Sequence, residues 1–260
     1  MHRYIILLIS TLLITVIPQV SYALGFEIGA GYMRHNPSGD FAYKPSSSID
    51  KLDIERDLRY ESGDRIYARI KVETPLLLPN VYGFITPIKF EETGSKTKNF
   101  TFGDITFDVT APFDSKLQMD LYDLCFFYSL PFLNKATLGK INAEIGLNAR
   151  LIDIDAEVSG RDAVTGLTET ESVNTIIPVP MIYAAIQLYP LDFLSIEAEG
   201  RGIAYSSSHY YDIIGKIKVK PIGPLFIAGG YRLNDMKIDY ADIEASIALS
   251  GPFIETGVVF

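Results

Sequence analysis

The chain contains little cysteine, histidine and tryptophan, and these shortages restrict the chemistry it can perform. Cys125 is the one cysteine among 260 residues, so an internal disulfide and a zinc site built from cysteines are both excluded. Tryptophan is absent, and only three histidines are present. Basic residues are also in deficit, at 23 against 32 acidic ones, which gives a net charge of −9. A nucleic-acid partner is therefore excluded, because binding phosphates requires a basic surface.

Long apolar runs are missing beyond the N-terminal segment. Residues 1–3 form a basic start, residues 4–17 an apolar core, and residues 21–23 place small residues where a signal peptidase reads them. We therefore predict a signal peptide over residues 1–23, cleaved between Ala23 and Leu24, and an outer-membrane β-barrel domain over residues 24–260. A membrane anchor is the alternative, but the apolar run is short for one. Past Ala23 no apolar segment approaches the roughly 20 residues of a spanning helix.

Apolar and polar residues alternate along the mature chain, and this period of two predicts β-strands. We expect ten strands, over residues 24–32, 65–73, 82–91, 116–130, 141–150, 176–189, 193–205, 210–220, 225–238 and 243–260. A membrane-spanning protein without apolar helices must be a closed barrel, because lipid offers backbone groups no hydrogen-bond partner. The pattern thus predicts an all-β fold, a transmembrane antiparallel up-and-down barrel in the outer membrane of a Gram-negative bacterium. Ten is an even number, so both termini are expected on the periplasmic side.

Long and short connections alternate in the first half of the chain. Residues 35–63, 92–115 and 156–173 are polar and are expected as external loops, the second with a strand-like piece of its own over residues 100–109. Two strands change the parity of their apolar residues, one near Tyr122 and one at Gly251-Pro252. Each change predicts a β-bulge.

The last strand ends the chain on an aromatic residue. Ile254, Thr256, Val258 and Phe260 occupy every second position and give this strand one apolar face. We expect it to close the barrel against the first strand and to be the segment that the barrel-insertion machinery recognises. Outer-membrane lipid is then the partner of the outer surface.

Several short motifs of the mature chain resemble those of an uncharacterised family of bacterial outer-membrane β-barrel proteins. They are Ser38-Gly39-Asp40-Phe41-Ala42-Tyr43, the acidic stretch over residues 53–58, Leu77-Leu78-Pro79-Asn80, Pro178-Val179-Pro180-Met181-Ile182-Tyr183-Ala184, Gly229-Gly230-Tyr231-Arg232, and Gly251-Pro252 before the terminal aromatic. The resemblance implies a location and a fold. It implies no reaction, so it carries over no catalytic residue.

Alternation assigns the polar residues of the strands to the lumen, because a charge facing lipid at mid-membrane costs about 2–4 kcal/mol. The lumen charge network is expected to contain Glu27, Arg69, Lys71, Glu144, Arg150, Glu197, Glu199, Arg201, Lys216, Lys218, Arg232 and Glu255, with Arg65, Glu73, Lys89, Glu91, Asp120, Asp123, Lys220 and Glu244 as further interior residues. The two signs are balanced, which favours a plug of mutual ion pairs over a path for one type of ion.

A catalytic or metal site has weaker support in the sequence. Residues 206–212, Ser-Ser-Ser-His-Tyr-Tyr-Asp, contain the residue types of a serine-hydrolase triad, but adjacent residues on a tight turn point apart. His35 and His209 are both expected near external loops. The acidic residues between Asp40 and Asp57 lack the spacing of a known calcium loop. We therefore expect no catalytic residue, no cofactor and no metal.

The sixth expected strand contains Pro178 and Pro180, two residues apart. Their missing N–H groups would have pointed at the same neighbouring strand, so two successive ladder bonds are absent there. A loosened rim is the simple interpretation. The functional one is a lateral gap in the barrel wall for an apolar ligand, with Met181 and Tyr183 on its lumen side.

The expected role is structural, ligand-binding or narrow transport, with the ligand unknown. The alternatives are an enzyme active at the barrel rim, hydrolytic or lipid-modifying, and a module that binds partners through its surface loops.

Overall fold

The computed structural model describes residues 24–75, 78–108, 110–240 and 242–260, which are almost entirely β-structure. The strands are β1 (Gly25–Tyr43), β2 (Leu52–Asp53), β3 (Gly63–Glu73), β4 (Asn80–Thr86), β5 (Lys89–Gly94), β6 (Phe100–Phe102), β7 (Ile105–Phe107), β8 (Phe113–Ser129), β9 (Ile141–Arg161), β10 (Thr168–Leu191), β11 (Leu194–Tyr205), β12 (Ser208–Ile222), β13 (Leu225–Tyr240) and β14 (Ile243–Val259). A 3-10 turn, η1 (Ser48–Asp50), and a short helix, α2 (Pro131–Ala136), complete the described elements. The predicted signal peptide and its cleavage after Ala23 lie outside the described residues and stay predictions.

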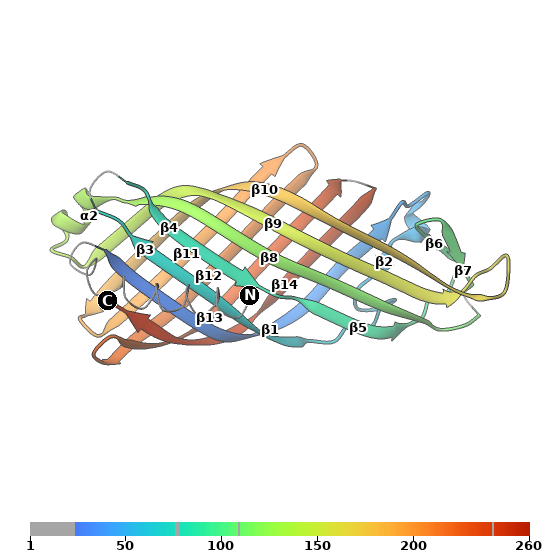
Figure 1. The fold of residues 1–260 in the computed structure, drawn as a ribbon, viewed down its shortest axis with the longest axis horizontal. Helices are drawn as coiled ribbons and strands as arrows, with labels where there is room; N and C mark the ends of the chain where they lie inside the picture. The colour runs from blue at the N-terminus through green and yellow to red at the C-terminus, as the bar shows by residue number, and fades with distance from the viewer. Residues whose placement is uncertain (1–23, 76–77, 109, 241) are drawn as a thin grey trace, which may run out of the picture.

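Ten antiparallel strands form a closed barrel, which confirms the predicted fold (Figure 1). Each strand pairs with its neighbour along the chain, and β4 and β5 together occupy one position beside β8. β14 closes the barrel by pairing with β1 over almost its whole length, with Ile254 opposite Tyr32. Phe26 and Phe260 exchange backbone hydrogen bonds of 2.8 and 3.1 Å at the end of this seam.

The two ends of the barrel differ. The start of β1, the end of β14 and helix α2 lie at one end, here called the terminal end; β2, η1 and the β6–β7 hairpin lie at the other, here called the loop end (Figure 1). No helix among the described residues is long and apolar enough to cross a membrane.

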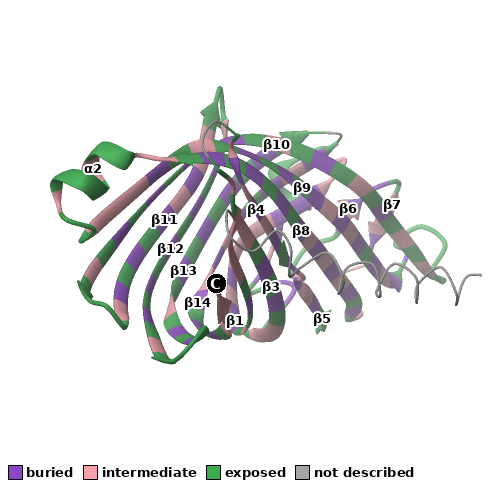
Figure 2. Ribbon diagram, turned by 60° about the vertical axis from the view of Figure 1, so that its left-hand side comes forward, coloured by how far each residue is buried: buried purple, intermediate pink, exposed green. Residues whose placement is uncertain are grey.

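An apolar belt surrounds the outer surface of the barrel. Outward residues alternate with buried ones along each strand (Figure 2). The apolar outward residues run from Tyr211 to Val219 on β12 and from Leu225 to Leu233 on β13. This is the length that a tilted strand needs to cross the hydrocarbon core, about 9–11 residues. The belt therefore has the height of a bilayer.

Beyond the belt, several strands continue toward the loop end and reverse the chemistry of their two faces. The outward residues of β8 become polar from Asp120 to Asp114, while Leu117 and Met119 face inward and are buried. The inserted segments β2, β6 and β7 contribute residues such as Leu52 and Phe102 to the same core. The loop-end half of the barrel is therefore filled by an apolar core and has a polar exterior.

This reversal overturns the two predicted bulges. Odd-numbered residues face inward along the whole of β8 and β14, and the pairing register shows no shift near Tyr122 or at Gly251-Pro252. The apolar residues change parity because they occupy the outer face, against lipid, within the belt. Beyond the belt they occupy the inner face, against the apolar core. Asp120, expected in the lumen, consequently lies on the outer face, where its carboxylate accepts a hydrogen bond from Gln118.

The expected external loops are shorter than predicted. β1 continues to Tyr43 in register with β14, so the predicted loop over residues 35–63 begins inside a strand. β9 runs to Arg161 and β10 begins at Thr168, which reduces the loop expected over residues 156–173 to residues 162–167. The polar outer faces of these extensions hid them, because strands outside the membrane need no apolar outer face.

Candidate functional site

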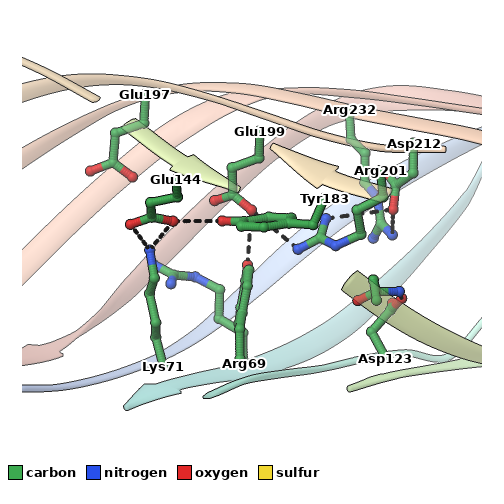
Figure 3. A network of polar contacts seen from close by, with 12 residues as sticks. Arg69, Lys71, Asp123, Glu144, Tyr183, Glu197, Glu199, Arg201, Asp212 and Arg232 are labelled. Atoms are coloured by element: carbon green, nitrogen blue, oxygen red, sulfur yellow. Dashed lines mark hydrogen bonds and ion pairs between the residues drawn. The ribbon is translucent and has the colours of Figure 1, made fainter. Parts of the chain in front are cut away.

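The centre of the lumen holds one carboxylate among three arginines. Asp212 on β12 is fully buried, and Arg232 from β13 donates to both of its carboxylate oxygens, over 2.8 and 2.7 Å (Figure 3). Arg150 from β9 donates to the same carboxylate, and Arg201 from β11 lies 3.8 Å from it. A second carboxylate, Asp123 on β8, accepts two bonds of 2.8 Å from Arg150. Five strands are thereby tied together across the lumen.

A second group of ion pairs fills the lumen nearer the terminal end. Lys216 lies 2.8 Å from Glu199 and 3.3 Å from Glu197. Lys218 bridges Glu197 and Glu27, at 2.8 and 2.9 Å. The ladder that the sequence predicts between β11 and β12 is therefore formed, with Glu197 directly opposite Lys216.

The remaining pairs connect β1, β3, β9 and β14. Arg69 on β3 donates to Glu27 and, over 2.7 and 2.9 Å, to Glu255. Lys71 donates to both oxygens of Glu144, over 2.7 and 2.8 Å, and Tyr183 adds a 2.8 Å hydrogen bond to that carboxylate (Figure 3).

Aromatic rings separate the charged groups. The Arg201 guanidinium carbon lies 4.9 Å from the centre of the Tyr82 ring, and that of Arg232 lies 4.7 Å from the Phe84 ring. The ring faces attract the cations, and the rings occupy space that water would otherwise take. The Tyr82 hydroxyl also donates to Glu199 over 3.1 Å.

The network is neutral as a whole. It consists of seven cations, Arg69, Lys71, Arg150, Arg201, Lys216, Lys218 and Arg232, and seven carboxylates, Glu27, Asp123, Glu144, Glu197, Glu199, Asp212 and Glu255. Each member forms an ion pair with at least one of the others. Within the described residues, this network therefore offers a passing ion no net charge, and each of its charged members already has a partner of opposite sign.

Two small cavities lie beside these pairs. The larger, of about 80 Å³, opens at the terminal end between charged residues including Glu27, Lys71 and Lys218. The smaller, of about 10 Å³, lies between Arg69, Lys216 and aromatic rings and has room for about one water molecule. Neither cavity is large enough for a drug-sized organic molecule, which needs several hundred Å³.

All twelve residues that the sequence assigns to the lumen network face inward and form part of it. Several further interior assignments are wrong. Lys89 and Glu91 form an exposed pair with each other, and Glu244 pairs with Lys51 at the loop end. Asp212 was not among the predicted interior residues, because it was considered as a candidate triad residue of the β11–β12 turn. Its even number, shared with Lys216 and Lys218, was the signal that it faces the lumen.

The hydrolase residues do not assemble. The Asp212 carboxylate is occupied by arginines, while His209 is at the surface, pairs with Asp235 at 2.7 Å and stacks on Tyr211. His35 lies buried on β1, inside the barrel.

The acidic residues of the first loop likewise serve local structure. Asp50 accepts hydrogen bonds from Ser46, Ser47 and Thr101. Asp57 accepts hydrogen bonds from Arg56 and from the Asp53 backbone N–H, and pairs with Lys96 at 3.3 Å. In the described part of the chain, no three histidine, cysteine or acidic side chains are grouped as metal ligands.

The two prolines of β10 lie where one of its ladders stops. β10 pairs with β9 through both Pro178 and Pro180, but its pairing with β11 begins only at Ile182, opposite Gly202. Met181 and Tyr183 face the lumen and are buried. Whether this interruption admits a ligand stays a prediction.

No family model matches the chain, and no curated protein matches it. Solved structures similar to it are outer-membrane proteins. The outer membrane protease OmpT from Escherichia coli is 9% identical, with 92% of this chain and 96% of that chain covered and a TM-score of 0.48. The translocator domain of the autotransporter NalP from Neisseria meningitidis is 9% identical, with 100% and 96% covered and a TM-score of 0.47. The attachment invasion locus protein Ail of Yersinia pestis is 11% identical, with 90% and 99% covered and a TM-score of 0.30.

Proposed function

We propose that this protein is an outer-membrane barrel with a sealed lumen, whose membrane section is a scaffold and whose loop end is its working surface. The apolar belt supports the location, because it has the height of a bilayer and surrounds a closed barrel. We assign it no catalytic residue. Because charged and aromatic side chains occupy the lumen, a structural or binding role is favoured over transport of polar solutes.

The balanced ion-pair network carries this proposal. Barrels of eight strands have room only for side chains or one small ligand, whereas 16–18 strands enclose an aqueous channel. This barrel has ten, and its interior is occupied by seven cationic and seven anionic side chains and by aromatic rings. An ion crossing it would have to break several buried pairs in succession, at several kcal/mol for each charge left unpaired.

Planar-bilayer recording on the full-length barrel tests the seal. We expect no steady conductance of the size of a general porin. The triple variant Glu199→Ala, Arg201→Ala, Lys216→Ala removes long side chains from one level of the lumen and should increase conductance, which shows that the assay detects an open path. Steady porin-sized conductance of the unmodified protein would disprove the sealed lumen.

A second function, entry of an apolar ligand through the barrel wall, is favoured by the interrupted ladder at Pro178 and Pro180. Both residues face outward within the belt, between Ile176 and Ile182. The residues behind them, Ile177 and Met181, belong to the apolar core of the loop end. A lipid-like molecule at this seam would therefore meet apolar side chains rather than the charged network.

Restoring the two backbone donors tests this seam. Pro178→Val with Pro180→Val should allow the β10–β11 ladder to extend, raise the resistance of the barrel to urea and reduce uptake of a dansyl-labelled fatty acid in lipid vesicles. Pro221→Val, near the terminal end of β12, is the matched control and should leave uptake unchanged. Unchanged stability and unchanged uptake in the double variant would show that no opening exists.

A further inference from the structure

β10 extends far beyond the hairpin that follows it. Its ladder with β9 runs from Thr168 to Leu188, whereas its ladder with β11 ends at Ile182. β11 and β12 end at a tight turn between Tyr205 and Ser208. The barrel wall therefore extends less far toward the loop end here than it does at β10 or at the β13–β14 hairpin (Figure 1). Among the described residues, no strand pairs with the second edge of β10 over residues 168–181.

The direction of the backbone groups shows which residues point to this free edge. The Tyr189 N–H donates to the Lys140 carbonyl, on the side of β9. Backbone groups alternate sides along a strand, so odd-numbered residues of β10 bond β9 and even-numbered ones point to the side of β11. The groups without a strand partner therefore belong to Thr168, Thr170, Ser172, Asn174 and Ile176, and to the two prolines below them.

The free edge divides into two parts. Pro178 and Pro180, at the level of the belt, have no N–H, so this part cannot template a complete new ladder. Above them, the even-numbered residues from Thr168 to Asn174 are exposed, uncharged and without proline. Lysine, proline, a bulge or an inward-pointing charge normally protects such an edge against pairing. This stretch has no lysine, proline or bulge, and its charges are the inward-facing Glu169 and Glu171.

We propose that the edge from Thr168 to Ile176 binds an extended peptide of a partner protein, added as an antiparallel strand in the place that β11 leaves empty. The inward side chains of the added strand would lie against the apolar core beside Val173 and Ile177. Glu169 and Glu171 stand on the same face nearer the tip. The matching peptide therefore has apolar residues at alternate positions and basic residues where it passes the two glutamates.

A second copy of the chain is a poor occupant of this edge. Two barrels inserted in one membrane share the same orientation, so their β10 strands run in the same direction across it. An antiparallel β10–β10 pair would require one copy to be inverted. A free peptide has no such restriction. The inference uses the free edge alone and does not depend on whether the lumen is sealed.

Binding of a synthetic peptide to the full-length barrel in lipid nanodiscs tests the proposal. The probe is fluorescein-labelled, about nine residues long to match the free edge, and alternates valine with arginine and threonine. We expect saturable binding by fluorescence anisotropy and slower amide exchange at Thr170, Ser172 and Asn174. The same peptide N-methylated at alternate residues cannot pair and should not bind.

Two variants separate backbone pairing from side-chain contact. Thr170→Pro with Ser172→Pro removes two N–H donors from the free edge and leaves the bonds to β9 intact. The same loss of donors at alternate positions already exists at Pro178 and Pro180. It should weaken binding roughly tenfold or more, because two ladder bonds are lost. Thr170→Val with Ser172→Val keeps both donors and should bind like the unmodified protein.

Three results would overturn the proposal. The first is no binding of the peptide up to about 1 mM. The second is equal binding by the proline and the valine variants. The third is efficient disulfide-linked dimerisation of Ser172→Cys, which would assign the edge to a second copy of the chain; the buried Cys125 does not interfere with this measurement.

Discussion

At the scale of single residues, Asp212 is the most consequential side chain of the lumen. Its carboxylate is bound by Arg150 and Arg232 and lies near Arg201, and its side chain is fully buried. Buried ion pairs are weak evidence for net stability, but removing one partner leaves the other charges without compensation in a medium of low polarity. Replacing Asp212 by a neutral residue would leave three guanidinium groups with Asp123 and Glu199 as their remaining carboxylate partners.

Asp212→Asn should therefore lower the free energy of unfolding by about 3–5 kcal/mol. Urea unfolding of the barrel in lipid vesicles, followed by far-UV circular dichroism, measures the change. Asp235→Asn is the matched control, because it removes the surface partner of His209 and should leave the midpoint close to that of the unmodified protein. Equal effects of the two substitutions would contradict the central role of Asp212.

The first loop should respond to acid through two carboxylates outside the membrane. Burial opposes ionisation of Asp50 and Asp57, but hydrogen bonds from Thr101 and Ser46 to the former, and from Arg56 to the latter, hold the pKa of each below its ordinary value of 3.8. A carboxylate with a depressed pKa in the folded state stabilises the fold above the unfolded pKa. That contribution is lost as the pH falls through the folded pKa.

Packing of the loop end should accordingly loosen as the pH drops below about 4, while the strands of the belt remain formed. Near-UV circular dichroism, to which Tyr60 contributes together with the other buried tyrosines, would follow side-chain packing, and far-UV circular dichroism would follow the strands. In the double variant Asp50→Asn, Asp57→Asn the acid transition should disappear and the loop should be looser already at pH 7. A transition that is unchanged in this variant would assign the effect to other groups.

At the scale of strands, alternation alone predicts the membrane section and fails beyond it. Lys216 and Lys218 alternate with outward apolar residues, and this contrast fixes both the strand and its inward face. In β14 the apolar residues from Ile243 to Leu249 also alternate, but they face inward, against the inserted loops. The pattern of one strand does not reveal whether its apolar face meets lipid or a core. That depends on what the loops insert, which is a property of the whole fold.

The extension of β10 shows a second limit of the sequence. Between Thr168 and Asn174 both faces are largely polar, because the outer face meets water and the inner one includes Glu169 and Glu171. Such a segment shows no difference in polarity between its two faces, so its sequence resembles that of a loop. The structure identifies it as a strand through its continuous register with β9. The candidate docking edge was therefore invisible to hydrophobic periodicity, although the two prolines below it were conspicuous.

At the scale of the whole molecule, charge is distributed unevenly along the barrel. The lumen network is balanced, whereas acidic residues outnumber basic ones in each segment that builds the loop end, residues 34–64, 89–120, 153–171 and 235–244. The net charge of −9 is therefore concentrated at the loop end. An acidic, water-exposed extension above a neutral section is suited to contact with basic partners.

This asymmetry also predicts how the barrel is oriented. Outer-membrane barrels have short turns on the periplasmic side and long connections outside. The turns at the terminal end, such as that between Leu191 and Leu194, are tight, and the polar extension lies at the other end. Ser48→Cys, at the loop end, should react with a membrane-impermeant maleimide on intact cells, and Asn134→Cys in α2 only after lysis. The buried Cys125 leaves the unmodified protein unlabelled as the control. Labelling of Asn134→Cys on intact cells, without labelling of Ser48→Cys, would reverse the orientation and place the free edge of β10 in the periplasm.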